Sequence, residues 1–469
     1  AVEPEPDEED EWQLYASAGY ASTGFILEET ETVEDKQPDD VWFDGDGDDF
    51  EGNTVNWDAP PCPAPLGIAH LIKIGVCDFC LHRIGGRRSD ERGAEAGAVL
   101  RREAYVRDEE LPSKVPQDFC PLCENLFDDI NNIVERVSES LSGTDYSTIQ
   151  FGIHLPKDLI QEEDRIRSRY GAPGSYPLKS ALVEAIHHRI RDVNDRVDFV
   201  KERPDIMVLV DGLTLRVDVD VRPLFLYGRY RKLVRDLPQT RWPCRACRGR
   251  AEGCESCGET GLQYPDSVQD LIGEPIREVL DADDTSFHGM GREDIDVRCL
   301  GSGRPFVLEI KRPSKRNHSL DDLVVRVNEN ASGKVELDSL SWCDRSKVHK
   351  VKQSRSEKTY TIRFRADDLA DEETVISAIS SLSGVVIDQE TPKRVSHRRA
   401  AKIRRRRVVS VSSILVEGDE VQFSARCEAG TYVKELVHSD EGRTVPSVQS
   451  AIDRECEVLW LDVEEIHAD

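Results

Sequence analysis

The chain has 469 residues, enough for two or three domains with cores of their own, and it carries a formal net charge of −29. It holds no run of eighteen apolar residues, and its first residues lack a basic start followed by an apolar core. These features exclude a membrane-spanning helix and a signal peptide in the given residues. We therefore expect a cytoplasmic protein with no membrane association, whose thirteen cysteines serve as metal ligands or buried thiols.

Residues 1–65 form an acidic segment that differs from the rest of the chain. The first sixty residues hold twenty Asp and Glu against one Lys, a net charge of −19, and show no sustained hydrophobic periodicity. This composition predicts a largely disordered extension. The remaining residues still carry −10, and the chain has 45 Arg but only 17 Lys. An acidic, Lys-poor composition is typical of halophilic archaea, where salt screens the repulsion between like charges.

The first predicted folded unit covers residues 66–221, and two pairs of cysteines lie near its start. Cys77, Cys80, Cys120 and Cys123 form a C-x2-C…C-x2-C set. Four thiolates can close a tetrahedral structural zinc site, and this reading ranks ahead of two unrelated buried or redox pairs. The 39 residues between the pairs make such a site a staple between distant segments.

Two further elements of this unit follow from hydrophobic periodicity. Apolar residues recur at helical spacing over residues 130–137, which predicts an amphipathic helix. Apolar strands over residues 206–210 and 213–221 flank Asp211-Gly212, a dipeptide typical of hairpin turns.

Basic and aromatic side chains alternate over residues 222–242. Cations next to exposed aromatic rings suit an RNA backbone with unstacked bases. A solvated charged face is the alternative, but three aromatic residues within residues 225–230 argue against it. We therefore expect RNA contacts from Arg229, Tyr230, Arg231, Lys232 and Arg241.

A second basic cluster, residues 393–407, holds nine Lys or Arg in an otherwise acidic chain. Because the four consecutive arginines 404–407 cannot all lie on one side of a strand, some must face solvent. We assign the cluster to RNA phosphates, with Arg394, Arg398 and Arg399 as the named candidates.

A tighter cysteine set lies between the two basic segments. Cys244, Cys247, Cys254 and Cys257 form two C-x2-C pairs only six residues apart, with glycines at turn positions around them. This spacing predicts a zinc knuckle over residues 244–257.

The segment G-R-E-D-I-D-V-R, residues 291–298, places carboxylates directly behind Arg292 in a turn flanked by Gly291 and Gly303. A carboxylate beside a cation stays ionised and can act as a nucleophile or a base. A structural Arg–Asp pair in a surface turn is the alternative reading. Helices alternating with strands over 306–310, 359–364, 407–411 and 421–427 predict an α+β second unit, residues 222–469, with a largely antiparallel sheet.

Five blocks in order resemble the archaeal-type tRNA pseudouridine synthases that act on the TΨC loop, and the resemblance covers about residues 66–464. The blocks are 226–232 (L-Y-G-R-Y-R-K), 237–240 (L-P-Q-T), 291–298, 394–399 (R-V-S-H-R-R) and 429–438 (A-G-T-Y-V-K-E-L-V-H). The resemblance implies a zinc-containing THUMP-type RNA-binding module at 66–221 and a pseudouridine synthase catalytic domain at 222–469. It also implies a flipped uridine as substrate and no redox or nucleotide cofactor.

The resemblance further assigns roles to single residues. It implies that Asp294 is the essential catalytic carboxylate, with Asp296 as the nearest rival. The resemblance also implies a pocket for the flipped uridine, in which Lys434 is the basic residue beside the catalytic carboxylate. The residues implied to form this pocket are Arg292, Tyr360, Tyr432, Val433 and Lys434.

Uridine 54, uridine 55 or both are candidate targets, in tRNA numbering, and tRNA is the expected partner with no obligatory protein partner evident. Two alternatives stay open. A THUMP-type methyltransferase or thiolase would need a glycine-rich cofactor loop, which is not seen. A non-catalytic tRNA-binding or chaperone protein would keep both cysteine sets but would not need Asp294 and Lys434.

Overall fold

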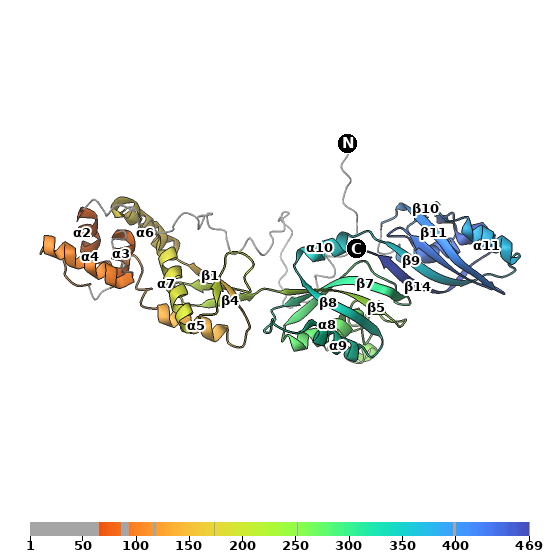
Figure 1. The fold of residues 1–469 in the computed structure, drawn as a ribbon, viewed down its shortest axis with the longest axis horizontal. Helices are drawn as coiled ribbons and strands as arrows, with labels where there is room; N and C mark the ends of the chain where they lie inside the picture. Colours follow the sequence, from red (N-terminus) through yellow and green to blue (C-terminus); the bar gives the residue numbers. More distant parts are fainter. Residues whose placement is uncertain are drawn as a thin grey trace, which may run out of the picture. The chain divides into compact units, whose positions relative to one another are not determined.

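The computed structural model describes residues 65–85, 93–115, 119–172, 174–250, 252–396 and 400–468 (Figure 1). The predicted acidic extension therefore lies outside the described residues, except for its last residue. No helix in the described ranges is both long enough and apolar enough to cross a membrane.

The first part of the described chain contains six helices followed or interrupted by short strands. They are α2 (Pro65–Lys73), α3 (Asp78–Gly85), α4 (Gly93–Arg107), α5 (Ile130–Ser140), β1 (Thr148–His154), α6 (Lys157–Tyr170), α7 (Leu178–Val193), β2 (Asp198–Phe199), β3 (Ile206–Asp211) and β4 (Val217–Val221). The four strands form one sheet in the order β2-β1-β3-β4, with β1 parallel to β2 and β3.

Hydrophobic patterning accounts for this sheet and its helices. Alternate residues of β1 and β3 are buried, as period-2 apolar patterns require. The predicted amphipathic helix is α5, which buries Ile133, Val134 and Val137. The predicted hairpin is the antiparallel pair β3–β4, although residues 213–216 belong to its turn rather than to a strand. Both sequence predictions are thus confirmed, the second with a shorter strand.

The second part of the chain begins with a long strand and contains a ten-stranded sheet. Its elements are β5 (Leu224–Lys232), the 3-10 turn η2 (Glu255–Cys257), α8 (Val268–Val279), β6 (Asp284–Gly289), β7 (Arg298–Lys311), α9 (Leu320–Ala331), β8 (Val335–Cys343), α10 (Ser346–Gln353), β9 (Glu357–Arg365), α11 (Glu372–Ser380), β10 (Val386–Glu390), the 3-10 turn η3 (Lys393–Val395), β11 (Ile403–Glu417), β12 (Glu420–Cys427), α12 (Val433–His438), β13 (Thr444–Val445), α13 (Val448–Ile452) and β14 (Glu457–His467).

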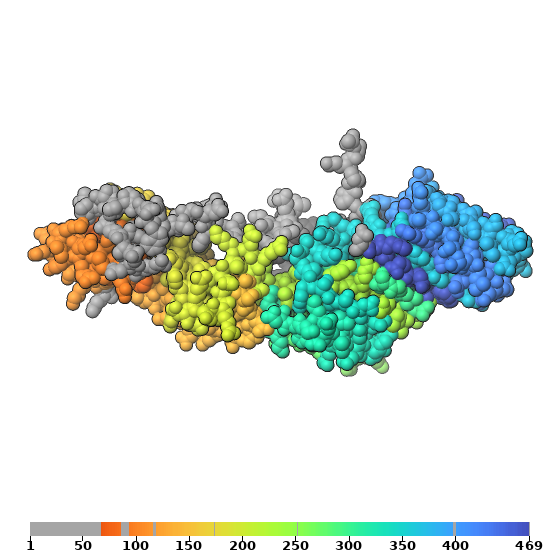
Figure 2. All heavy atoms as spheres, in the orientation of Figure 1, coloured from red at the N-terminus to blue at the C-terminus, as the bar shows by residue number. Residues whose placement is uncertain are grey.

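The strands of this sheet follow the order β13-β10-β11-β12-β9-β14-β7-β5-β8, with β6 paired to β7. All of its pairings are antiparallel except β7–β14, so the predicted largely antiparallel sheet is confirmed. Strand β14 brings the C-terminal residues beside β9 and next to the α10 region, visible as dark blue against blue-green in Figure 2.

Two hydrophobic cores pack against this sheet. Helices α8 and α9 cover Phe306, Leu308 and Ile310 of β7. The other core joins Val307 of β7 to strands β9, β12 and β14 and to helices α10–α13. Because alternate residues of a strand face opposite sides, β7 is buried on both faces and sits at the centre of the domain.

Candidate active site and metal centres

The loop between β6 and β7, residues 290–297, carries the predicted catalytic motif. Gly291 adopts a φ of +70°, a conformation that favours glycine, and turns the chain after β6. Beneath the loop, the buried Glu293 carboxylate pairs with Nε of the buried Arg304 at 2.7 Å. Arg304 also donates from Nη1 to the carbonyl oxygen of Met290 at 2.7 Å. One buried cation therefore anchors the loop at two points.

Two side chains from β5 complete this support. The Tyr230 hydroxyl donates to Glu293 Oε1 at 2.8 Å. Lys232 Nζ donates to backbone carbonyl oxygens of the loop, at 3.2 Å for Asp294 and 3.0 Å for Ile295. Both side chains are fully buried, and burial raises the pKa of Tyr230 and lowers that of Lys232. The prediction that these two residues contact RNA is wrong, because both side chains lie inside the protein and hold the loop.

Above the anchor, the loop presents two carboxylates to two cations. Asp294 Oδ2 lies 3.1 Å from Arg394 Nη1 and 3.5 Å from Lys434 Nζ. Asp296 binds Lys434 through both oxygens, at 2.9 and 2.8 Å. Burial acts to raise the pKa of Asp296, but the hydrogen bonds and charge of Lys434 outweigh it and leave this pKa below its usual range. The structure thus brings Asp294 and Lys434 together.

Arg394, predicted as an RNA contact, lies in η3 and bridges two acidic groups. Its Nε donates to Oε1 of the buried Glu435 at 2.7 Å, while Nη1 reaches Asp294. Burial opposes its charge, but Glu435 and Asp294 raise the pKa of Arg394 overall. The guanidinium is therefore held by two carboxylates on opposite sides.

The predicted uridine-pocket residues come from β9 and from the start of α12. Tyr360 lies on β9, and burial raises its pKa, with the charge of Asp294 acting in the same direction. Tyr432 is fixed by Gln389, which accepts from its N–H and donates to its carbonyl oxygen, each at 2.9 Å. Arg404 lies over the Tyr432 ring at 5.9 Å. Val433 is 5% exposed and packs into the core.

The other predicted RNA-binding arginines are engaged within the protein. Arg231 pairs with Asp338 and Glu336, and Arg241 pairs with Asp270 and Glu274. Because both arginines retain partial exposure, these pairs leave them at the surface.

Two further arginines lie near chain segments of functional interest. Arg229 donates from Nη2 to the carbonyl oxygen of Ala468 at 2.6 Å. Arg292 lies over the Trp242 ring at 5.1 Å and so links the catalytic loop to the residues that precede the second cysteine set. Arg398 and Arg399 lie outside the described residues.

Both cysteine sets converge in space. The Sγ atoms of Cys77, Cys80, Cys120 and Cys123 lie within 4.8 Å of one another, and so do those of Cys244, Cys247, Cys254 and Cys257. Three separations in the second set are 3.7 to 3.9 Å, and Cys77 and Cys123 are 3.6 Å apart. A tetrahedron with Zn–S bonds of about 2.3 Å has edges of about 3.8 Å, so these thiols fit one tetrahedral ion each.

Backbone N–H groups point at the same sulfur atoms. Cys254 and Gly261 donate to Cys257 Sγ at 3.1 and 3.2 Å, and Cys77 donates to Cys120 Sγ at 3.3 Å. Such donors stabilise negative charge on sulfur. The donor chemistry therefore suits thiolate–metal coordination in both sets.

Sequence reasoning missed the residues that support the loop, namely Glu293, Arg304, Gln239 and Glu435. Gln239 donates to the Tyr230 hydroxyl at 2.9 Å and to the Gly291 carbonyl oxygen at 3.0 Å. One signal was present in the sequence, since Glu293 belongs to the G-R-E-D segment and Gln239 to the L-P-Q-T block. Nothing in the sequence indicated that Arg304, eleven residues after Glu293, would turn back to it.

Comparison with known proteins places this geometry in a family. Residues 225–467 match the family model described as Pus10, C-terminal, and residues 133–211 match the Pus10 THUMP domain, archaeal. The chain belongs to the Pus10 family of tRNA pseudouridine synthases. It is therefore an isomerase, and the predicted THUMP-type module and pseudouridine synthase domain are confirmed.

Relatives named tRNA pseudouridine synthase Pus10 match over most of the chain. That of Methanothrix thermoacetophila is 37% identical over 423 residues, covering 84% of this chain and 92% of the relative. That of Methanothermobacter marburgensis is 38% identical, covering 83% and 95%. The Halorubrum lacusprofundi protein is 35% identical, covering 83% and 92%.

Solved structures resemble this Pus10-family chain only slightly. One matching chain comes from a solved structure described as a Cbf5-Nop10-Gar1 complex, and it is 19% identical to this chain. The match has a TM-score of 0.26 and covers 41% of this chain and 43% of that chain. The family assignment therefore rests on the sequence matches.

Proposed function

We propose that this enzyme converts uridine to pseudouridine in the TΨC loop of tRNA, at uridine 54, uridine 55 or both, and that Asp294 is its catalytic carboxylate. The observation that carries the proposal is the position of Asp294 between two cations, Arg394 at 3.1 Å and Lys434 at 3.5 Å. At these distances the two cations fix the carboxylate in place by charge-assisted contacts, and a positioned carboxylate can act as a nucleophile toward carbon.

The neighbouring carboxylates fit the role less well. Glu293 is buried and its oxygens are engaged by Arg304 and Tyr230, so it cannot meet a substrate without dismantling the loop. Asp296 holds both its oxygens against Lys434. The Asp296 side chain is more exposed than that of Asp294, at 52% against 36%, but Asp294 has the longer contacts with its cations, and this favours Asp294 as the group that meets the substrate.

The reaction needs no external reagent. The C1′–N1 bond breaks, the base turns, a C1′–C5 bond forms, and the proton from C5 is replaced by one at N1, so atoms and electrons balance. The uridine must leave its stack to reach Asp294, and an aromatic side chain such as Tyr360 can pack against the flipped base. Tyr432 and Val433 at the start of α12 are proposed to close the pocket, with Arg292 contacting RNA near the loop.

Arg394 acts in this proposal as a positioning residue. Glu435 is 2% exposed at its side chain and fixes the guanidinium from the protein side. The other side of the guanidinium then fixes Asp294. A guanidinium held by a buried partner loses little entropy on binding the second carboxylate, which suits a pre-organised site.

We also propose that each cysteine set holds one structural Zn²⁺. Four thiolates with separations close to a tetrahedral edge and no open position are typical of structural rather than catalytic zinc. The first set would staple the α2–α4 region to the segment around residue 120, and the second would shape the knuckle next to Trp242. We propose tRNA as the partner and the THUMP module as one of the parts that bind it. The protein would act in the cytoplasm, without an obligatory protein partner.

An assay on unmodified tRNA transcript tests the proposed activity. Purified protein should form pseudouridine at position 54, 55 or both, mapped by chemical labelling and primer extension. A transcript with cytidine at both positions is the control and should stay unmodified. Tight tRNA binding without any pseudouridine in the TΨC loop would contradict the proposal.

A further inference from the structure

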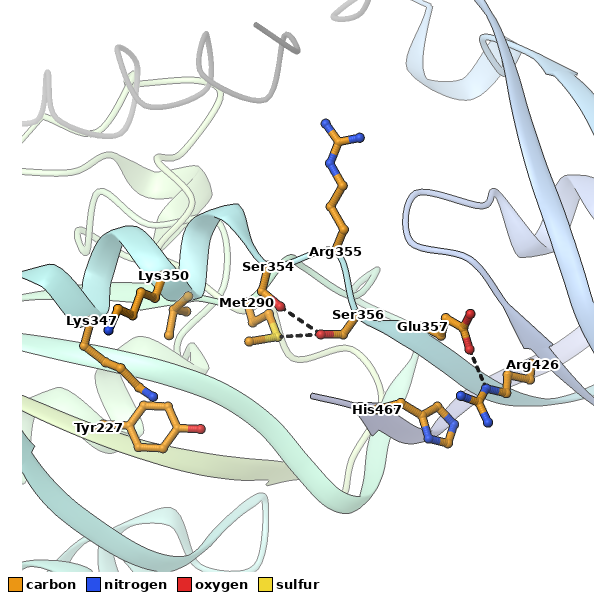
Figure 3. Close-up of a pocket in the computed structure, with 11 residues that line it drawn as sticks. Tyr227, Met290, Lys347, Lys350, Ser354, Arg355, Ser356, Glu357, Arg426 and His467 are labelled. Carbon is orange, nitrogen blue, oxygen red and sulfur yellow. Dashed lines mark hydrogen bonds and ion pairs between the residues drawn. The ribbon is translucent and has the colours of Figure 1, made fainter. Parts of the chain in front are cut away.

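A cationic cavity lies apart from Asp294, at the junction of α10, β9, β12 and β14 (Figure 3). Its volume is about 570 Å³, within the range of about 300–1,000 Å³ typical of small-molecule sites. Its cationic lining comes from Lys347, Lys350, Arg355 and Arg426. The sole carboxylate in the lining belongs to Glu357, which accepts a hydrogen bond from Arg426 at 2.6 Å. The cavity therefore carries an excess of positive charge.

The source of this charge is unusual for the chain. Four of the 17 lysines fall within residues 347–358, in a protein whose net charge is −29. Neither Lys347 nor Lys350 has a carboxylate partner within 4 Å in the described part of the chain, whereas Arg231, Arg241 and Arg363 each have two. A like-charged cluster destabilises the folded protein unless an anion neutralises it. The cluster thus indicates an anionic ligand.

The shape of the cavity points to the class of anion. Lys347 Nζ lies 4.2 Å from the centre of the Tyr227 ring, so the ring holds the ammonium at the cavity wall. Figure 3 shows the end of the Lys347 side chain next to this ring. The Ser354 and Ser356 hydroxyls are bonded to each other at 2.8 Å, and Ser356 reaches Met290 Sδ at 3.6 Å. Cations, hydroxyls and an aromatic ring in one cavity suit a phosphate with its attached nucleoside.

The cavity is joined to the catalytic loop through its own wall. Met290 lines it, and the Met290 carbonyl oxygen accepts from Arg304, the residue that pairs with buried Glu293. The segment Ser354–Glu357 continues into β9, which carries Tyr360 three residues later. Met290 and β9 therefore belong both to the cavity wall and to the surroundings of the catalytic loop.

We propose that this cavity binds a phosphate and nucleoside of the substrate RNA, at a nucleotide other than the uridine that reacts. The inference rests on the proposed function, because it takes the substrate to be RNA. Lys347 and Lys350 bind the phosphate, and Tyr227 lies against the sugar or base.

The test measures tRNA affinity over a series of KCl concentrations, with the full chain and without turnover. The double variant Lys347→Gln/Lys350→Gln should weaken binding about tenfold near 0.1 M salt, and the slope of log K against log[salt] should fall by about 1–2. The matched control is Lys315→Gln/Arg326→Gln, which removes two charges near α9, a helix packed on the opposite core. The control should leave both quantities unchanged.

Ultraviolet cross-linking then locates the contact. A nucleotide attached to the peptide that contains Tyr227 is the expected product. Equal affinity and slope in the lysine variant and its control would overturn the proposal, as would cross-links confined to other peptides. This test measures tRNA binding and not catalysis. Failure to form pseudouridine would therefore overturn the proposed function without showing whether RNA binds in the cavity, and the two failures stay distinguishable.

Discussion

At the scale of single residues, the site consists of a buried ion pair that holds the loop and of two partly exposed carboxylates, Asp294 and Asp296. Glu293 and Arg304 are both buried and hold the loop, while Asp294 remains 36% exposed between Arg394 and Lys434. The same eight-residue segment thus supplies a structural carboxylate and a candidate catalytic one. Burial, not residue type, separates the two roles.

The anchor predicts a large loss of stability from one substitution. Glu293→Ala leaves the Arg304 guanidinium buried without its partner, which costs about 3–5 kcal/mol. Denaturant unfolding followed by circular dichroism measures the change. The comparison variant is Asp338→Ala, which removes an exposed carboxylate from the partly exposed Arg231 and should cost about 0–1 kcal/mol. Equal losses in the two variants would contradict the anchoring role.

Arg394 yields a second prediction at this scale, because positioning and phosphate binding affect different constants. If it positions Asp294, Arg394→Gln should lower kcat by about 10–100-fold, equivalent to ~1.4–2.7 kcal/mol, with little change in tRNA Kd. If Arg394 only binds an RNA phosphate, the substitution should change the tRNA Kd and its salt dependence and leave kcat unchanged. Arg312→Gln, which changes an exposed arginine outside both basic clusters, is the surface comparison and should change neither constant.

At the scale of secondary-structure elements, the sequence predicted those features that depend on a pattern within a short segment. Helix α5, the β3–β4 hairpin and the strands at 306–310, 359–364 and 421–427 follow from periodicity and are present. Both cysteine sets follow from C-x2-C spacing and converge. Such local patterns can be recognised without knowing how the elements pack against one another.

The sequence could not reveal which polar residues turn inward. Tyr230 and Lys232 lie in a basic, aromatic segment, yet alternation along β5 directs both into the protein, where Glu293 and loop carbonyl groups receive them. Such pairing depends on strand order, because β5 lies next to the loop only by pairing with β7, the strand that follows the loop. The lysine cluster of α10 was visible as a composition but acquires meaning only from the cavity it lines.

The two metal centres give a prediction at the element scale. Elemental analysis of purified protein should find about two Zn²⁺ per chain, one for each set of four thiols. Cys120→Ser should destabilise the N-terminal unit, whereas Cys254→Ser should mainly weaken tRNA binding. Absence of zinc, or the colour of an iron–sulfur cluster, would contradict the assignment.

At the scale of the whole molecule, an acidic chain must bind an acidic substrate. The net charge of −29 includes −19 from residues 1–60, which sit in the same chain as the basic cluster 393–407. Strong salt would shorten the Debye length from about 10 Å at 0.1 M to about 3 Å at 1 M and so weaken any competition between this segment and tRNA. Stacking and shape would then carry more of the affinity.

Removal of residues 1–60 should therefore tighten tRNA binding at low salt and change little at multimolar salt. Binding curves for the full-length and truncated chains across one KCl series measure the effect. Equal affinities at low salt would mean that the acidic segment does not compete with RNA.

The central claim is that Asp294 is the carboxylate that performs the isomerisation, and one pair of variants tests it most directly. Asp294→Asn keeps the size and polarity of the side chain, so it should fold and bind tRNA with near-normal affinity yet form no pseudouridine in a single-turnover assay. Asp296→Asn, which weakens only the bidentate contact with Lys434, should retain measurable turnover. Full turnover in Asp294→Asn together with its loss in Asp296→Asn would contradict the account.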